Sequence, residues 1–389
     1  MFLAIVANLF AVLIGTILAG IFLLWHKPHL DVDGNTIITL KKSPNQINQF
    51  DIAHLVALIA LKHALPAFTG YRPPLLPEPG SAQAFRLPCV RLEGPLSLTE
   101  GNLRVFNRAV LKDGLRPTEA GTNPFFLIAQ TVPLAINILA HRDCPIKPFG
   151  AVNTRNTFRF INPSAIRDWK TLVAASKLGQ ISYSAVFGGP GHPGRRRKRG
   201  VDFCITIDVR HGKETILKQD LWFLQSLPRF YKPIYQEAAA DGVQLVAADV
   251  QQDRSKANGR ALRISGRDPR RWAATSKDYN PIHVSAMGAK LFGFKSVIAH
   301  GNHVVALAVQ QLVDAKTDEE KAAKARVWET DAAFEIEAKF LRPTTLPASL
   351  TADWSMQSGD QDAIALNVRG REKLNVTAVV RPTVTEKLS

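Results

Sequence analysis

The sequence predicts an α+β protein in which a curved antiparallel sheet wraps around a central helix, with this unit present twice. Two long apolar segments of helical spacing, 124–141 and 299–315, are each followed by several short segments of strand-like composition. A helix followed by antiparallel strands, occurring twice in one chain, is the pattern of a duplicated α+β unit. An uncharged segment at the start of the chain adds a membrane helix to this prediction.

The composition is that of a folded globular protein with a strongly basic balance. The chain has 389 residues, of which 46% are hydrophobic, and a length of this order predicts two or three domains. Its three cysteines, Cys89, Cys144 and Cys204, are widely spaced and fit neither a disulfide framework nor a zinc site of paired thiolates. The formal net charge of +16 predicts acidic partners such as carrier proteins or nucleotide phosphates.

Residues 1–25 are predicted to form a transmembrane anchor. The segment carries no charge, and about 20 apolar residues suffice to cross a bilayer as a helix. It lacks the basic start and the short apolar run of a cleaved signal peptide, and Trp25 is suitably placed at the interface. The first basic residues follow the span, which predicts a single-pass protein with its catalytic body on the cytoplasmic side.

Residues 26–80 are expected to be a juxtamembrane lead-in and linker. They contain apolar residues at helical spacing over 50–65 and end in a proline-rich stretch. The boundary near residue 80 leaves 81–235 as an N-terminal half and 236–389 as a C-terminal half. Strands are expected at 157–163, 181–187, 201–209 and 215–227 in the first half, and at 332–347, 350–358, 362–370 and 373–382 in the second.

A run of basic residues at 194–200 is expected to lie in a solvated hairpin loop. It follows glycine- and proline-rich chain and stands between two strand-like segments. A nucleic-acid surface would interleave basic residues with aromatic ones, and this run contains no aromatic residue. A nucleic-acid partner is therefore not predicted.

The strongest functional signal lies within 275–303. Asp278, Asn280 and His283 belong to the motif D-x-N-P-I-H, and A-H-G ends at Gly301 where the second long helix begins. The loop offers a general base and a partner, and the first N–H groups of a helix can bind a developing oxyanion. These groups are needed to add water to, or remove it from, a double bond conjugated with a carbonyl.

This stretch resembles the MaoC-like (R)-specific enoyl-CoA hydratases, the hydratase-2 family, of the double-hotdog type. The resemblance extends loosely over 81–389 and implies a tandem hotdog fold with a non-catalytic first half and a catalytic second half. It implies an (R)-specific enoyl-CoA hydratase or 3-hydroxyacyl thioester dehydratase of fatty-acid metabolism. The substrate would be a thioester of coenzyme A or of acyl carrier protein, and no cofactor is expected.

The resemblance also assigns roles to individual residues. The expected site consists of Asp278 and His283 as the catalytic pair that activates water, Asn280 and Gly301 as supporting and oxyanion groups, and Ala299 and His300 as substrate-binding groups. The two halves are expected to pair within one chain, and a homodimer is left open.

Two positions depart from the family pattern and keep alternatives open. Lys277 places a charge beside the catalytic acid where the family has a small residue, and Asn302 stands where methionine is usual. A non-catalytic protein of the same fold that binds acyl thioesters, or serves as a scaffold, is the first alternative. A metal site built from the acid together with His283, His300 and His303 is the second, and it is not favoured because no carboxylate is evident to orient the histidines.

Overall fold

The structure is a computed structural model of the chain. It describes residues 29–30, 36–40, 42–69, 76–77, 84–111, 123–141, 150–189, 191–197, 200–226, 259–315, 329–356, 363–371 and 373–383, with a few isolated residues between these ranges.

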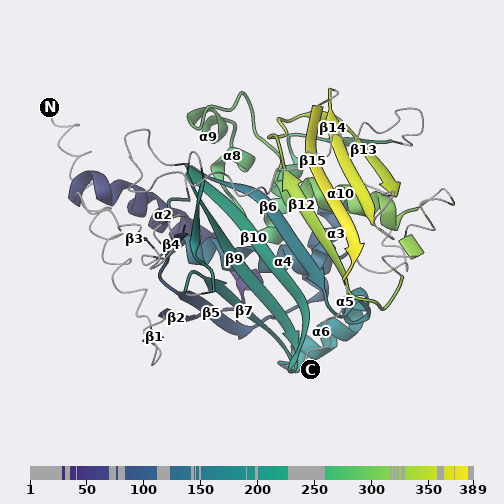
Figure 1. Cartoon of the computed structure of the whole chain (residues 1–389), viewed down its shortest axis with the longest axis horizontal. Helices are drawn as coiled ribbons and strands as arrows, with labels where there is room; N and C mark the ends of the chain where they lie inside the picture. The colour runs from purple at the N-terminus through teal and green to yellow at the C-terminus, as the bar shows by residue number, and fades with distance from the viewer. Residues whose placement is uncertain are drawn as a thin grey trace.

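One twisted sheet runs through the molecule (Figure 1). Its first part consists, in spatial order, of β1 (His29–Leu30), β2 (Thr36–Thr39), β5 (Val90–Pro95), β7 (Ile181–Phe187), β9 (Gly200–His211), β10 (Glu214–Ser226) and β6 (Ala151–Phe160). The second part continues with β12 (Phe334–Phe340), β15 (Lys373–Pro382), β14 (Ile364–Gly370), β13 (Ala348–Met356) and β11 (Arg260–Ile264). Three short strands lie off this path, β3 (Leu76–Pro77), β4 (Ala84–Arg86) and β8 (Gly194–Arg197).

Each part of the sheet packs against its own long helix. Helix α4 (Phe125–Ala140) lies against the first part and α10 (Gly301–Val313) against the second, and most residues of both are buried. A helix that is apolar nearly all round belongs in a core, which is why these two segments become central helices. The arrangement agrees with the predicted α+β hotdog architecture.

Shorter helices connect these elements. They are α3 (Glu100–Val110), α5 (Pro163–Arg167), α6 (Trp169–Lys177), α7 (Asp268–Ser276), α8 (Pro281–Val284) and α9 (Ala286–Leu291). Helix α3 packs against α7, so a helix of the first half contacts the segment that leads into the motif of the second.

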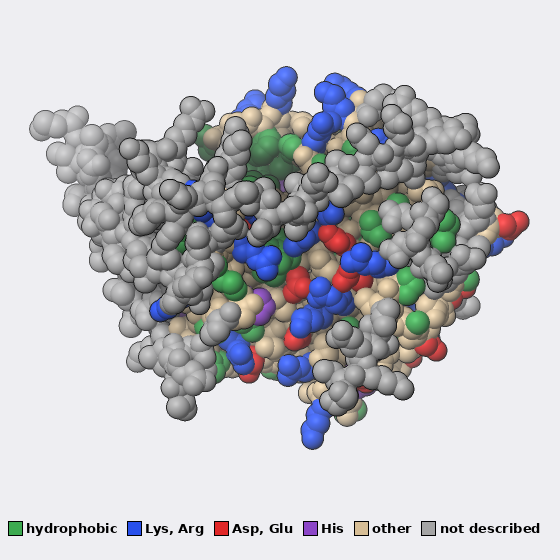
Figure 2. Space-filling view, viewed as in Figure 1, with side chains coloured by type: hydrophobic (Ala, Val, Ile, Leu, Met, Phe, Trp, Pro, Cys, Tyr) green, Lys and Arg blue, Asp and Glu red, His purple; other side chains and the backbone are tan. Residues whose placement is uncertain are grey.

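The two parts of the sheet meet where β6 pairs with β12. Phe160 and Phe334 stack across this junction with ring centroids 4.5 Å apart. On the opposite face Arg159 binds Asp220 of β10 at 2.7 Å and Glu335 of β12 at 2.8 Å. Basic and acidic side chains alternate over this face of the sheet (Figure 2). A single hydrophobic core extends through both halves, so the expected pairing within one chain is present.

The predicted membrane anchor is not supported, and the single-pass topology with a cytoplasmic catalytic body is withdrawn with it. Residues 1–25 lie outside the described residues, and among the helices the structure describes none is long and apolar enough to span a bilayer. Hydropathy alone does not separate a membrane helix from a helix that is buried by its own chain.

The described part of 26–80 belongs to the folded body. A short 3-10 helix, η1 (Pro44–Gln46), leads into α2 (Gln49–Thr69), and α2 packs against α4. The helix predicted over 50–65 is therefore present and is longer than expected. The proposed domain boundaries near residues 80 and 235 fall outside the described residues.

The basic run is not a simple loop. Residues Gly194–Arg197 form β8, which pairs with β9 and β4. Arg197 binds Asp202 at 2.7 Å, and the guanidinium of Arg195 lies 5.4 Å from the ring centroid of Trp222. Because these residues of the neighbouring strands pair with its arginines, the run can form a strand at the sheet edge, where charged strands are common.

Candidate active site

The motif forms a tight connection between two short helices. Helix α7 ends at Lys277, which adopts a left-handed conformation with φ of 56° and turns the chain away from the helix axis. The Asn280 side chain then accepts from the N–H of Ile282 at 3.3 Å and starts α8. Its own N–H donates to the Asp278 carboxylate at 3.2 Å. These two bonds hold the loop in shape, and the supporting role of Asn280 in catalysis stays a prediction.

The tautomer of His283 is set by the backbone. Its Nδ1 lies 2.8 Å from the carbonyl oxygen of Ile298, and a carbonyl can only accept, so Nδ1 carries the proton. Nε2 is left with a lone pair. Burial lowers the pKa of His283 below its ordinary value, against the opposing attraction of Asp278. The imidazole is therefore neutral near pH 7 and can act as a base.

Asp278 and His300 are held together beside that base. His300 Nε2 donates to the backbone oxygen of Asp278 at 3.0 Å and lies 3.7 Å from its carboxylate. The rings of His283 and His300 stack with centroids 3.8 Å apart. Burial, and then the neighbouring His283, lower the pKa of His300 well below its ordinary value. His300 is only 4% exposed, but it lines the cavity beside His283 and its contacts hold Asp278 in place.

Gly301 begins helix α10 at the same site. The N–H groups of the first turn have no acceptor within a helix, and the residue before the helix, His300, makes no side-chain capping bond. A Cβ at Gly301 would lie 2.5 Å from two ring atoms of Phe340, so only glycine fits this position. The helix can therefore approach β12 closely while its uncapped N-terminus faces the cavity.

Ala299 does not line the cavity. Its N–H donates to the Thr344 carbonyl at 2.9 Å, and the residue is buried. This hydrogen bond fixes the extended segment before α10 to the loop that contains Thr344.

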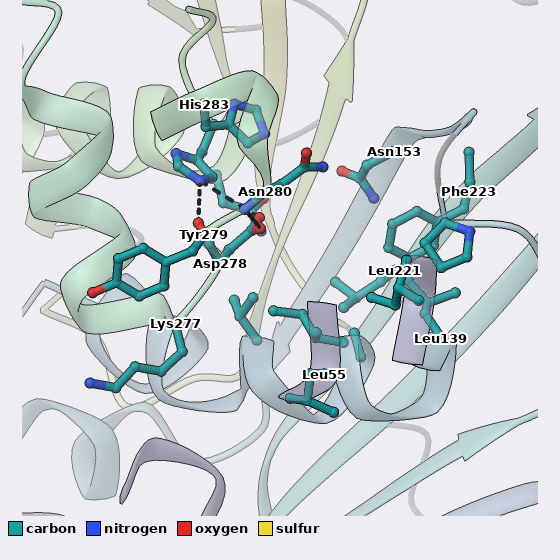
Figure 3. A pocket seen from close by; sticks show the side chains of 18 of the residues that line it. Leu55, Leu139, Asn153, Leu221, Phe223, Lys277, Asp278, Tyr279, Asn280 and His283 are labelled. Carbon is teal, nitrogen blue, oxygen red and sulfur yellow. Dashed lines mark hydrogen bonds and ion pairs between the residues drawn. The ribbon is translucent and has the colours of Figure 1, made fainter. Parts of the chain in front are cut away.

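Lys277 points away from the catalytic acid (Figure 3). Its Nζ donates to the Ala274 carbonyl at 3.0 Å, and burial lowers its pKa. The charge that departs from the family pattern is thus bound to the C-terminal turn of α7 and does not pair with Asp278.

The alternative metal set is only partly assembled. Ligand atoms of Asp278, His283 and His300 lie within 4.8 Å of one another, and each histidine places one ring nitrogen on a backbone carbonyl. His303 is elsewhere, with Nε2 2.9 Å from the Ala109 carbonyl and its ring stacked on Trp272. The contacts of the three clustered residues fit a proton-transfer site in which the backbone orients both rings.

A cavity of about 210 Å³ opens from this cluster into the first half of the chain. One water needs roughly 10–15 Å³ of such space, so the cavity holds far more than an attacking water. Most of its apolar walls come from the segment before residue 80 and from the first half, namely α2 (Ile52, Leu55, Val56, Ile59), α4 (Val132, Ala135, Ile136, Leu139) and β10 (Leu221, Phe223).

Sequence reasoning missed these wall residues. The helical spacing of apolar residues over 50–65 was the only available signal, and it indicates a helix without indicating its partner.

Three asparagines complete the wall between the halves. Asn153 donates to Asn156 at 2.8 Å, and Asn156 donates to Asn302 at 2.7 Å.

Comparisons with known proteins match the segment that contains this site. A family profile described as "MaoC like domain" matches residues 248–355. The 3-hydroxyacyl-thioester dehydratase X of Mycobacterium tuberculosis is 27% identical over 240 residues, covering 61% of this chain and 70% of that protein. The chain thus carries a MaoC-like dehydratase domain and is homologous to that dehydratase.

Solved structures agree on the fold. The crystal structure of HtdX from Mycobacterium tuberculosis matches with a TM-score of 0.52 and 24% identity, covering 76% of this chain and 100% of that chain. A MaoC-like dehydratase from Phytophthora capsici matches with a TM-score of 0.52 and 12% identity, covering 78% of this chain and 97% of that one. At these identities the likeness concerns the fold.

Proposed function

We propose that the protein is a hydratase or dehydratase of fatty-acid metabolism, which adds water to trans-2-enoyl thioesters or removes it from (R)-3-hydroxyacyl thioesters. The MaoC-like domain and the homology to a 3-hydroxyacyl-thioester dehydratase support this reaction class. The observation that carries the proposal is the lone pair on His283 Nε2. Nε2 keeps this lone pair because Nδ1 donates to the Ile298 carbonyl. Nε2 lies near the Asp278 carboxylate, at the same site as the uncapped start of α10.

In the hydration direction one water lies between His283 and the carboxylate of Asp278. As the water oxygen attacks C3 of the enoyl group, the pair removes its proton, and the electrons of the double bond move toward the thioester carbonyl. The N–H of Gly301 stabilises the negative charge on that oxygen. The same pair then returns a proton to C2, and dehydration follows these steps in reverse.

The remaining site residues support this pair. Asn280 orients the loop through its cap of α8, and His300 fixes the backbone and the carboxylate of Asp278. Ala299 holds the chain that leads into the oxyanion helix. Because a single pair serves both C2 and C3, both additions occur on one face of the substrate, and the family resemblance assigns the (R) product.

The thioester itself accepts the electrons, so the reaction as written needs no bound cofactor. Either coenzyme A or an acyl carrier protein can be the handle, since both are acidic and the chain carries a net charge of +16.

Absorbance-monitored hydration of crotonyl-CoA and longer 2-enoyl-CoA esters by the full chain tests the proposal. The conjugated enoyl thioester should disappear, and chiral analysis should identify the (R)-3-hydroxyacyl product. Folded protein that binds acyl-CoA but turns over no chain length would favour the non-catalytic alternative. Formation of the (S) product would contradict the stereochemical part alone.

A further inference from the structure

We propose that helix α2 is a specificity element, whose apolar stripe closes the acyl site and limits the length of the aliphatic chain that the protein accepts. The inference rests on the proposed function for the thioester substrate. It concerns a helix outside both central-helix units and different residues from those that handle the water.

Helices α2 and α4 present matching stripes to the cavity. The lining residues are Ile52, Leu55, Val56 and Ile59 on α2, and Val132, Ala135, Ile136 and Leu139 on α4. Both sets follow the spacing i, i+3, i+4, i+7, which is one face of a helix. Two facing apolar stripes form a slot that suits an alkyl chain.

The slot lies away from the reacting groups. Leu55, Leu139 and Phe223 occupy the side of the cavity opposite the loop that carries Asp278 (Figure 3). Among the described lining residues, only Lys277 and Asp278 carry a carboxylate or a lysine or arginine charge, and both lie at the catalytic end. A thioester with its C2 and C3 at the water-activating pair would therefore extend its alkyl chain toward α2.

Buried hydrogen bonds fix the start of α2 on the first half. Asn45 donates to the Ser97 carbonyl at 2.6 Å and to the Gln130 side chain of α4 at 3.3 Å. Ser43 accepts from the Ser97 N–H at 2.8 Å. Since Ser43 and Asn45 are both buried, the position of α2 over the cavity is set by specific contacts.

Some buried residues of α2 line the cavity and others do not, so the two kinds of position can be substituted separately. Ile47, Leu55, Leu58 and Ile59 form a small hydrophobic cluster with Ala140 that is distinct from the main core. Leu58 is 1% exposed but does not line the cavity, unlike its neighbour Leu55. A substitution at Leu58 therefore disturbs the same helix without altering the slot.

The test compares Leu55→Trp with Leu58→Ala in the full chain. Each buried methylene contributes roughly a threefold to fourfold gain in affinity, so a side chain that displaces two or more should cost at least about tenfold. Leu55→Trp should lower the ratio of kcat/KM for dodec-2-enoyl-CoA to that for crotonyl-CoA by this factor. Leu58→Ala should leave this ratio unchanged. If Leu55→Trp does not fold, Val56→Phe replaces it, because Val56 is a partly exposed lining position.

Binding of the unreactive saturated esters dodecanoyl-CoA and butyryl-CoA separates the inference from the proposed function, because it requires no turnover. Selective loss of dodecanoyl-CoA binding in a protein without hydratase activity would retain the inference and refute the function. A folded Leu55→Trp or Val56→Phe variant with wild-type chain-length preference in both turnover and binding would overturn the inference, as would an equal shift in Leu58→Ala.

Discussion

The two halves begin their central helices in opposite ways. The N-cap residues of the two helices, Pro124 and His300, make no side-chain cap bond. Helix α4, however, starts with the buried Phe125 and Phe126, 0% and 1% exposed, and the Asn123 side chain accepts from the Phe125 N–H at 3.0 Å. Helix α10 starts with Gly301 and has no side-chain cap. A helix N-terminus can bind an oxyanion only where its donors are free and a substrate can approach. On the proposed function, this difference would leave the first half in a structural role and the second half with the reactive groups.

The largest expected effect comes from removing the reactive groups of the second half. Asp278→Asn and His283→Ala should each lower kcat by roughly two to four powers of ten, the range of general acid–base groups. The double variant should lose little more than the worse single variant, because groups that share one water do not act independently. Steady-state kinetics with crotonyl-CoA measure this.

Thermal unfolding of the same variants provides the control. Near-wild-type kcat in a folded His283→Ala variant would refute the mechanism and would reduce the second half to a binding unit like the first.

The next effect concerns the start of α10. Gly301→Ala should destabilise the protein by about 1–3 kcal/mol, because the added methyl overlaps Phe340. It should also lower kcat by displacing the oxyanion donor. Denaturant unfolding and kinetics measure the two effects, and adding Phe340→Ala should restore much of the kcat. Full activity in Gly301→Ala alone would show that the helix start does not contact the thioester.

A smaller effect, on stability, should follow from His303 and pH. Burial lowers its pKa to about 4 from an unfolded value of about 6.5, so the neutral form is favoured in the folded state. The stabilisation is complete above pH 6.5 and is lost as the pH falls toward 4, at a cost of up to about 3 kcal/mol. Denaturant unfolding across this range should show the loss.

His303→Gln supplies the comparison for that experiment. Its stability should fall less steeply between pH 6.5 and 4, with His283 and His300 supplying the residual slope. An identical slope in both proteins would contradict the assignment.

The smallest effect should come from the asparagine contact between the halves. Asn302→Met restores the usual family residue and removes the 2.7 Å bond from Asn156. The expected loss of stability is about 1 kcal/mol, because Asn156 lines the cavity and water there can replace the lost acceptor. Asn156→Ala also removes the bond accepted from Asn153, but the double variant should still lose less than the sum of the two single variants. Additive losses would show that the two amides are not coupled.

The reactive half was easier to predict than the structural half. The D-x-N-P-I-H loop and Gly301 are encoded within one short stretch, and local chemistry dictates their arrangement: Asn280 caps the next helix and the Ile298 carbonyl orients the histidine. The chain between the D-x-N-P-I-H motif and Gly301 is short, so the motif and the helix start are expected to lie close together in the fold. The roles of Asp278 and His283 remain predictions until the variants are measured.

The cavity wall could not be predicted because it depends on contacts distant along the chain. Leu55 and Asp278 line one cavity although more than two hundred residues separate them, and no local pattern records that meeting. The sequence also led to two wrong predictions. The uncharged segment 1–25 lies outside the described residues, among whose helices none can span a membrane, and the charges of β8 did not reveal the strands that accept them.

The β6–β12 junction has a consequence for any attempt to divide the chain. Cutting the halves apart would expose the backbone N–H and C=O groups of β12 as a bare edge, together with the ring of Phe334. Unpaired edges of this kind recruit other strands and favour aggregation. The second half therefore depends on the first to cover its sheet edge as well as to complete its cavity, and the two are best regarded as one folding unit.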